Sequence, residues 1–108
     1  MDKVNEFMKK YYVAYMAQGV EYILPIKRVK CLDGFSISVQ ANKYAYCSPR
    51  CNKGWPYSEV ELGFPSELDP LISEYAEDPD DVKTIYGYVP INIVCQLIDK
   101  HGGISNFE

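Results

Sequence analysis

Residues 29–41 constrain the fold most, because they combine an alternation of apolar and polar side chains with an Asp33-Gly34 turn signal. A two-residue turn at Asp33-Gly34 would place the charged Lys30 beside Ile37, which mixes charge with core. A three-residue turn over 32–34, with the glycine in the left-handed region, pairs Cys31 with Phe35 instead. One face then carries Val29, Cys31, Phe35, Ile37, Val39 and Ala41. The sequence therefore predicts a β-hairpin with a three-residue bulged turn.

The N-terminal residues predict a helix over 2–18. Apolar residues recur there at spacings of three and four, and Gly19 is a typical residue for ending a helix. The apolar positions are Val4, Phe7, Met8, Tyr11 and Tyr15. Residues 20–26 are expected to be extended, with Pro25 marking an edge or a break.

The rest of the chain predicts alternating strands and helices. We expect a strand over 57–64, whose inward residues are Ser58, Val60, Leu62 and Phe64. A short helix should follow from Asp69-Pro70 to Tyr75, and its inward residues are Leu68, Leu71, Ile72 and Tyr75. A strand over 84–89 and a final helix from Pro90, with Ile91, Val94, Cys95 and Ile98 inward, complete the set. The prediction is one α+β domain with an antiparallel sheet of about four strands, an N-terminal helix, a short middle helix and a C-terminal helix. Residues 1–25 form the N-terminal helix and extended segment, and residues 26–104 the core.

Charge is unevenly distributed along the chain. Residues 1–53 contain nine Lys or Arg, whereas residues 59–81 contain nine acids and no base, within a net charge of −4. If the fold separates these segments, the protein has a positive and a negative side, and if the strands interleave, the charges mix. The acidic candidates for contact with a protein partner are Glu59, Glu61, Glu77, Asp78, Asp80 and Asp81.

Aromatic residues are abundant, with ten tyrosines in 108 residues. Because tyrosine is enriched at interfaces, this excess indicates a binding surface or a homodimer. Aromatic and basic side chains interleave between residues 43 and 57, a pattern that fits a protein partner, an anionic nucleotide, nucleic acid or a loop packed on its own sheet. The net acidity makes direct nucleic-acid binding the least favoured partner. The ligand-binding candidates are Lys43, Tyr46, Arg50, Lys53, Trp55 and Tyr57.

The sequence contains no motif typical of an enzyme, so we expect a non-enzymatic protein without a cofactor. Cys47 and Cys51 are four residues apart, which permits a zinc pair or a disulfide, whereas Cys31 and Cys95 fall at core positions. Free cysteines are the favoured interpretation. The chain has no apolar run of membrane-spanning length and no secretion signal, so a cytoplasmic protein is expected.

Six segments together resemble small uncharacterised proteins encoded by bacteriophages and prophages, over roughly residues 34–104. They are Gly34-Phe-Ser-Ile-Ser-Val-Gln-Ala41, Tyr46-Cys-Ser-Pro-Arg50, Val60-Glu-Leu-Gly-Phe-Pro-Ser66, Tyr75-Ala-Glu-Asp78, Tyr86-Gly-Tyr-Val-Pro90 and Lys100-His-Gly-Gly-Ile104. The resemblance implies a context in which such proteins inhibit a host defence component, for example a CRISPR effector. It also implies an alternative, in which they sequester a signalling nucleotide. It carries over no functional residue.

Overall fold

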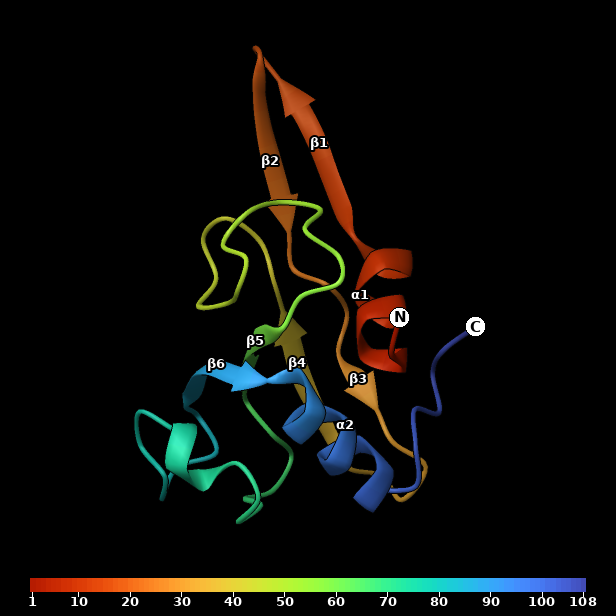
Figure 1. Cartoon of the computed structure of the whole chain (residues 1–108), viewed down its shortest axis with the longest axis vertical. Helices are drawn as coiled ribbons and strands as arrows, with labels where there is room; N and C mark the ends of the chain where they lie inside the picture. The colour runs from red at the N-terminus through yellow and green to blue at the C-terminus, as the bar shows by residue number, and fades with distance from the viewer.

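A four-stranded antiparallel sheet, in the order β3-β4-β5-β6, forms the centre of the protein, and a separate two-stranded sheet projects from it (Figure 1). The computed structural model describes residues 1–108. The helices are α1 (Lys3–Tyr11), the 3₁₀ helix η1 (Ser73–Tyr75) and α2 (Ile91–Lys100). The strands are β1 (Val13–Ala17), β2 (Val20–Leu24), β3 (Val29–Lys30), β4 (Ser36–Gln40), β5 (Glu59–Gly63) and β6 (Ile85–Pro90). The α+β class is therefore confirmed.

The hairpin predicted for residues 29–41 is present with the predicted register. Val29 lies opposite Ile37, and the backbone N–H of Cys31 donates to the Phe35 carbonyl at 2.8 Å. Gly34 has φ of +97°, the left-handed conformation that the three-residue turn requires. Side-chain alternation alone thus selected the correct turn.

One face of the four-stranded sheet contributes to a single hydrophobic core together with α1 and α2. Among the 21 buried residues of this core are Val39 and Leu62 from the sheet, Phe7 from α1 and Leu97 from α2. The two helices contact each other, and α2 contacts β6. Strands and helices that are distant in sequence therefore share one core.

Asn5 joins α1 to the sheet through hydrogen bonds that imitate a neighbouring strand. Its side chain is fully buried, accepts from the Tyr57 backbone N–H at 2.7 Å and donates to the Tyr57 carbonyl at 3.0 Å. Asp2 caps α1, because its side chain accepts from the Asn5 backbone N–H at 2.8 Å. The start of α1 is thereby fixed to the strand that begins at residue 59.

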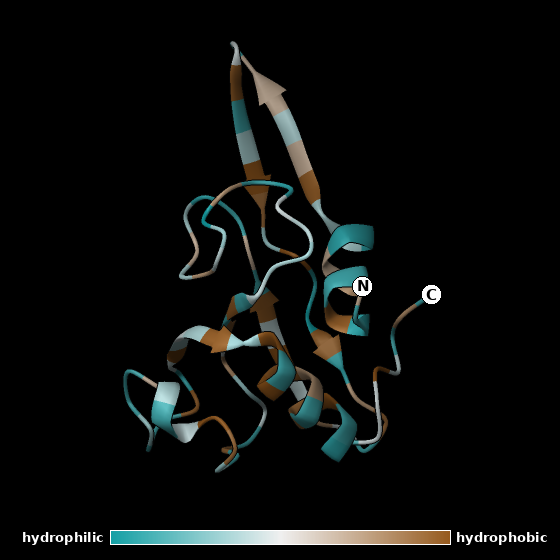
Figure 2. Ribbon diagram, viewed as in Figure 1, coloured by the Kyte–Doolittle hydropathy of each residue, from teal (hydrophilic) through white to brown (hydrophobic).

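The N-terminal helix is shorter than predicted, because residues 13–24 form a β-hairpin instead of continuing it. Gln18 and Gly19 both have positive φ, 51° and 77°, as a two-residue hairpin turn requires. A left-handed glycine is common both after helices and in such turns, so Gly19 alone did not distinguish them. Figure 2 shows hydrophobic residues on both strands of this projecting hairpin.

Three further predictions about side chains are wrong at the ends of elements. Phe64 follows β5 at φ of 51° and is exposed, since the strand ends one residue earlier. Ser58 and Leu68 are exposed as well. The predicted middle helix is only the 3₁₀ turn η1, whereas α2 matches its prediction, with Val94 and Ile98 buried.

Candidate functional site

Three exposed tyrosines and an arginine form a cluster on the side of the sheet where β6 lies. We call Tyr44, Tyr46, Tyr88 and Arg50 the tyrosine patch. The rings of Tyr46 and Tyr88 are 5.9 Å apart, and the Arg50 guanidinium lies 5.4 Å from the centre of the Tyr46 ring. Arg50 also donates to the Tyr44 carbonyl at 3.1 Å, and the Tyr88 N–H donates to the Tyr46 carbonyl at 3.0 Å. The side chains of Tyr46, Tyr88 and Arg50 are therefore in contact, whereas Tyr44 joins them through its backbone carbonyl.

Gly87 packs against Tyr46 of this patch. A Cβ atom at this position would lie 3.4 Å from the Cβ of Tyr46 and 3.8 Å from its ring, which is ordinary van der Waals contact. The next residue, Tyr88, has φ of 51°, which turns the strand locally. The backbone of β6 is therefore shaped to bring Tyr46 and Tyr88 together.

An acidic loop follows the segment that pairs with the other end of β6. We call residues 77–81 the acidic loop, and its carboxylates are Glu77, Asp78, Asp80 and Asp81. Ala76 pairs with Tyr86, and the Glu77 N–H donates to the Ile85 carbonyl at 3.0 Å. Loop residues 42–50 and the acidic loop therefore both contact β6, at Tyr88 and at Ile85 respectively. The tyrosine patch and the start of the acidic loop therefore border the same strand.

Within the acidic loop, two carboxylates stabilise the backbone and two are free of hydrogen bonds. Asp78 accepts from the Asp80 N–H at 3.2 Å, and Asp81 accepts from the Lys83 N–H at 2.8 Å. The side chains of Glu77 and Asp80 make no hydrogen bond within the chain. These two carboxylates can therefore meet a cationic partner without disturbing the loop.

The other two acidic candidates, Glu59 and Glu61, are half-buried and hydrogen-bonded within the protein. Glu59 accepts from the Ser48 hydroxyl at 2.7 Å, and Glu61 accepts from the Tyr46 N–H at 3.1 Å. They hold loop residues 46–48 against β5, and they thereby fix the backbone that carries Tyr46 of the tyrosine patch. The sequence placed them on the outer face correctly but did not indicate this bracing role.

The six predicted ligand-binding residues do not converge on one cavity. Tyr57 is almost fully buried, and its hydroxyl donates to the Cys51 carbonyl at 2.6 Å. Trp55 packs edge-on against Tyr12, with ring centres 5.3 Å apart. Of the six, only Lys53 lines any cavity, the one beneath the projecting hairpin. Tyr46 and Arg50 belong to the tyrosine patch.

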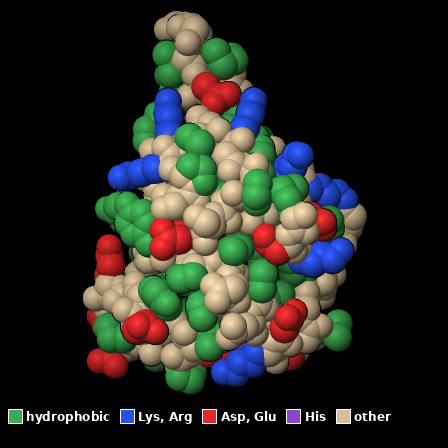
Figure 3. Space-filling view, in the orientation of Figure 1, with side chains coloured by type: hydrophobic (Ala, Val, Ile, Leu, Met, Phe, Trp, Pro, Cys, Tyr) green, Lys and Arg blue, Asp and Glu red, His purple; other side chains and the backbone are tan.

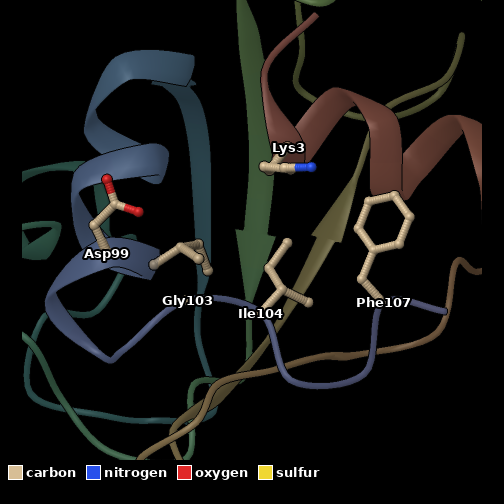
Figure 4. Close-up of a pocket in the computed structure, with 6 residues that line it drawn as sticks. Lys3, Asp99, Gly103, Ile104 and Phe107 are labelled. Carbon is tan, nitrogen blue, oxygen red and sulfur yellow. The ribbon is translucent and has the colours of Figure 1, made fainter.

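The largest cavity, of about 370 Å³, lies between α1, α2 and the C-terminal segment. Figure 4 shows Lys3 from α1 and Asp99 from α2 on opposite sides of a mostly apolar floor that includes Ile104 and Phe107. A ligand site usually contains several convergent polar groups, and this cavity offers one lysine and one carboxylate. It is therefore a weaker candidate site than the tyrosine patch.

Lysines surround an aromatic cluster beside that cavity. The Lys27 ammonium lies 3.7 Å from the centre of the Tyr11 ring, and the Lys10 and Lys3 ammonium groups lie 5.4 and 5.8 Å from the Phe107 ring. In Figure 3 basic side chains are more frequent at the top and right, and acidic ones at the lower left, with mixing between. The protein thus separates its basic and acidic side chains only in part, and the two kinds mix over much of this face.

His101 lies between two carboxylates. Its Nδ1 is 2.7 Å from Asp33 Oδ2 and its Nε2 is 2.9 Å from Asp69 Oδ2, and the ring stacks on Phe35 at 4.0 Å. Ionised carboxylates only accept hydrogen bonds, so both ring nitrogens carry protons. Burial lowers the pKa of His101, but the hydrogen bonds to Asp33 and Asp69 outweigh it and the pKa is raised above 6.5.

Both partners of His101 have lowered pKa values. The Phe35 N–H and then His101 lower the pKa of Asp33. Burial raises the pKa of Asp69, but hydrogen bonds from the Leu71 N–H, Lys100 and His101 bring it below 3.8. We call Asp33, Asp69, Lys100 and His101 the ionic cluster. No sequence pattern indicated this cluster, because Asp33, Asp69 and His101 lie far apart in the chain.

The cysteines are free thiols in the structure. Burial raises the pKa of Cys31 to about 11, and burial also raises the pKa values of Cys47 and Cys95. Such thiols are weak nucleophiles because only the thiolate reacts. No three His, Cys, Asp or Glu side chains are arranged to hold a metal ion.

No protein-family model matches this chain, no curated protein matches it, and no solved structure matches it. Neither helix of the protein has the length and hydrophobicity needed to cross a membrane.

Proposed function

We propose that this protein is a non-enzymatic, phage-encoded binding protein that inhibits a host defence component, such as a CRISPR effector, by protein–protein contact. The observation that carries the proposal is the tyrosine patch beside the acidic loop. Tyrosine and arginine are the residues most often found at the energetic centres of interfaces. The phage context, and with it the cytoplasm of a bacterial host, is the expectation that follows from the resemblance of residues 34–104.

The contacts within the tyrosine patch lower the entropy cost of binding. The Tyr46 ring contacts both the Arg50 guanidinium and the Tyr88 ring, so the rotations of these side chains are already restricted before a complex forms. The exposed faces of the rings supply apolar area, and the hydroxyls supply hydrogen bonds. This combination suits the core of a protein interface.

The acidic loop selects a basic partner. The side chains of Glu77 and Asp80 are exposed and make no hydrogen bond within the chain, and the Glu77 backbone bonds to Ile85 of the strand that carries Tyr88. Carboxylates at an interface rim accelerate association with a positive surface, and their effect is screened by salt. A basic nucleic-acid-binding surface on a defence effector has the complementary charge.

A plaque assay identifies the target. Bacterial strains that each carry one defence system, including CRISPR effectors, are infected with and without expression of this protein. We expect restored phage growth in at least one strain, followed by binding of the purified effector in calorimetry. Full defence in every strain, with no binding to any purified effector, would overturn the proposal.

Two matched double variants then test the surface. Glu77→Lys with Asp80→Lys changes the charge by four units in the acidic loop, and Asp99→Lys with Glu108→Lys makes the same change away from it. We expect the first variant to lose affinity for the effector and the second to keep it. Equal affinity of both variants at low salt would show that the acidic loop is not the contact.

A further inference from the structure

The projecting hairpin β1–β2 presents one face made only of apolar and tyrosine side chains. Val13 pairs with Leu24, Tyr15 with Tyr22 and Ala17 with Val20, so these side chains point to the same side. The five larger ones are each 44% to 52% exposed. At the centre, the rings of Tyr15 and Tyr22 stack at 5.3 Å with an interplanar angle of 18°. We call these six residues the hairpin face.

The opposite face of the same hairpin is partly covered by the protein itself. The Asn52 side chain donates to Glu21 at 3.0 Å, and Lys53 lines a cavity with Ala14 and Met16. Residues 42–56 therefore lie against that side. The larger side chains of the hairpin face stay about half exposed, although Tyr15 lines a cavity with Lys53 and Leu24 lines one with Tyr44. Figure 1 shows β1 and β2 projecting beyond the rest of the fold.

An isolated two-stranded hairpin is at best marginally stable in water, and stable ones pack an apolar face against something else. We propose that the hairpin face packs against the hairpin face of a second copy, forming a two-fold symmetric dimer. This proposal is independent of the proposed function, since it concerns a different surface and needs no host protein.

Charge favours a second copy over a charged partner. In a two-fold interface the same patch meets itself, so a face without charges is self-complementary and leaves no charge unpaired. The hairpin face contains no charged residue. Its four central tyrosines in the dimer would place ring against ring with the hydroxyls at the margin, where water can reach them.

The small area of the face indicates a weak interface. Five large side chains that are about half exposed offer roughly 450 Å² per copy, at about 150–200 Å² for each whole side chain. Two copies then bury about 900 Å², below the roughly 1,200–2,000 Å² of stable specific interfaces and close to their lower limit of about 1,000 Å². The dimer is therefore weak, with a dissociation constant on the order of 10–100 µM.

Sedimentation velocity from about 5 to 500 µM tests the proposal, because this range spans the expected dissociation constant. We expect the wild type to shift from monomer to dimer within it. Tyr15→Lys places a charge in the hairpin face and should weaken the dimer at least about tenfold. Met16→Lys is the matched control, since the neighbouring residue is 65% exposed but points to the other side. It should dimerise like the wild type.

Circular dichroism melting accompanies each variant, and Val20→Asp at the tip provides a second disruption in case Tyr15→Lys alters the hairpin. A wild type that stays monomeric up to about 500 µM overturns the proposal. Equal loss of the dimer in Tyr15→Lys and Met16→Lys also overturns it, because the interface then lies elsewhere. If the wild type is monomeric and Tyr15→Lys loses binding to a purified effector, the hairpin face belongs to a host protein and not to a second copy.

Discussion

The ionic cluster makes the stability of this protein depend on pH in a defined direction. The pKa of His101 is raised in the folded protein, so its stabilising contribution is fully present below pH 6.5 and is lost as the pH rises through the folded pKa. The pKa values of Asp33 and Asp69 are lowered, so their contributions are present above pH 3.8 and are lost in acid. The cluster therefore stabilises the fold most between pH 3.8 and 6.5.

The magnitude follows from the contact between His101 and Asp69, whose side chains are 8% and 3% exposed. A hydrogen bond between charged groups contributes about 1.5–3 kcal/mol, and burial removes most solvent screening. His101→Gln keeps one amide donor but loses the charge. Below pH 6.5 we expect it to lower the free energy of unfolding by about 2 kcal/mol, which corresponds to a melting temperature lower by about 10 °C.

Urea unfolding of the wild type and His101→Gln between about pH 6 and 9 measures this effect. The difference in unfolding free energy should shrink as the pH rises, because wild-type His101 then loses its proton while glutamine does not titrate. Other titrating groups are shared by both proteins and cancel in the difference. A difference that stays constant or grows with pH would refute the assignment of a charged His101. The NMR titration of its imidazole provides an independent value of the pKa.

Three further substitutions or reagents test the packing. Asn5→Leu leaves the backbone N–H and carbonyl of Tyr57 without partners, so it should lower the free energy of unfolding measured in urea by about 2–4 kcal/mol. A loss under about 0.5 kcal/mol would contradict the docking of α1 through Asn5. Gly54→Ala should cost about 1–3 kcal/mol in the same assay, because its Cβ would lie 2.8 Å from Cys51 Sγ, and an unchanged unfolding midpoint would count against it. Iodoacetamide at pH 8 should alkylate the exposed Cys51 first. It should alkylate Cys31 last, because Cys31 is buried and has a pKa of about 11. Mass spectrometry that finds the reverse order would contradict the burial of Cys31.

Residues 29–41 show what a local pattern can predict. Only one turn length keeps Val29 and Ile37 on the same face without bringing Lys30 into the core, and the observed register is that one. The same argument placed Val60 and Leu62 inside. Wherever one face of a strand is buried and the other is wet, the alternation determines the pairing.

Residues 13–24 show why the same approach failed nearby. Both faces of this hairpin carry apolar residues, such as Tyr15 on one side and Met16 on the other, so no alternation is visible. Tyr11 and Tyr15 also continue a helical spacing of four, and Gly19 fits the end of a helix as well as a turn. The sequence pattern therefore fits both a longer helix and a β-hairpin, and the strand pairing across Gln18-Gly19 shows that the hairpin forms.

The tyrosine patch and the ionic cluster depend on contacts between distant parts of the chain. His101 meets Asp33 across 68 residues, and no spacing rule links such positions. Tyr46 was singled out as part of an aromatic and basic segment, but its neighbour Tyr88 comes from β6. Sequence patterns named individual members, and only the fold brought them together.

The isolation of β1 and β2 divides the chain into two levels of stability. Their backbone hydrogen bonds connect only residues 13–24, so they can open while the four-stranded sheet stays intact. Strands β4, β5 and β6 bring together residues between 36 and 90, so their amides are released only when the whole core opens. Hydrogen exchange in the monomer should therefore be fast in the hairpin and slow in the sheet, and whatever covers the hairpin face can be detected as slower exchange there.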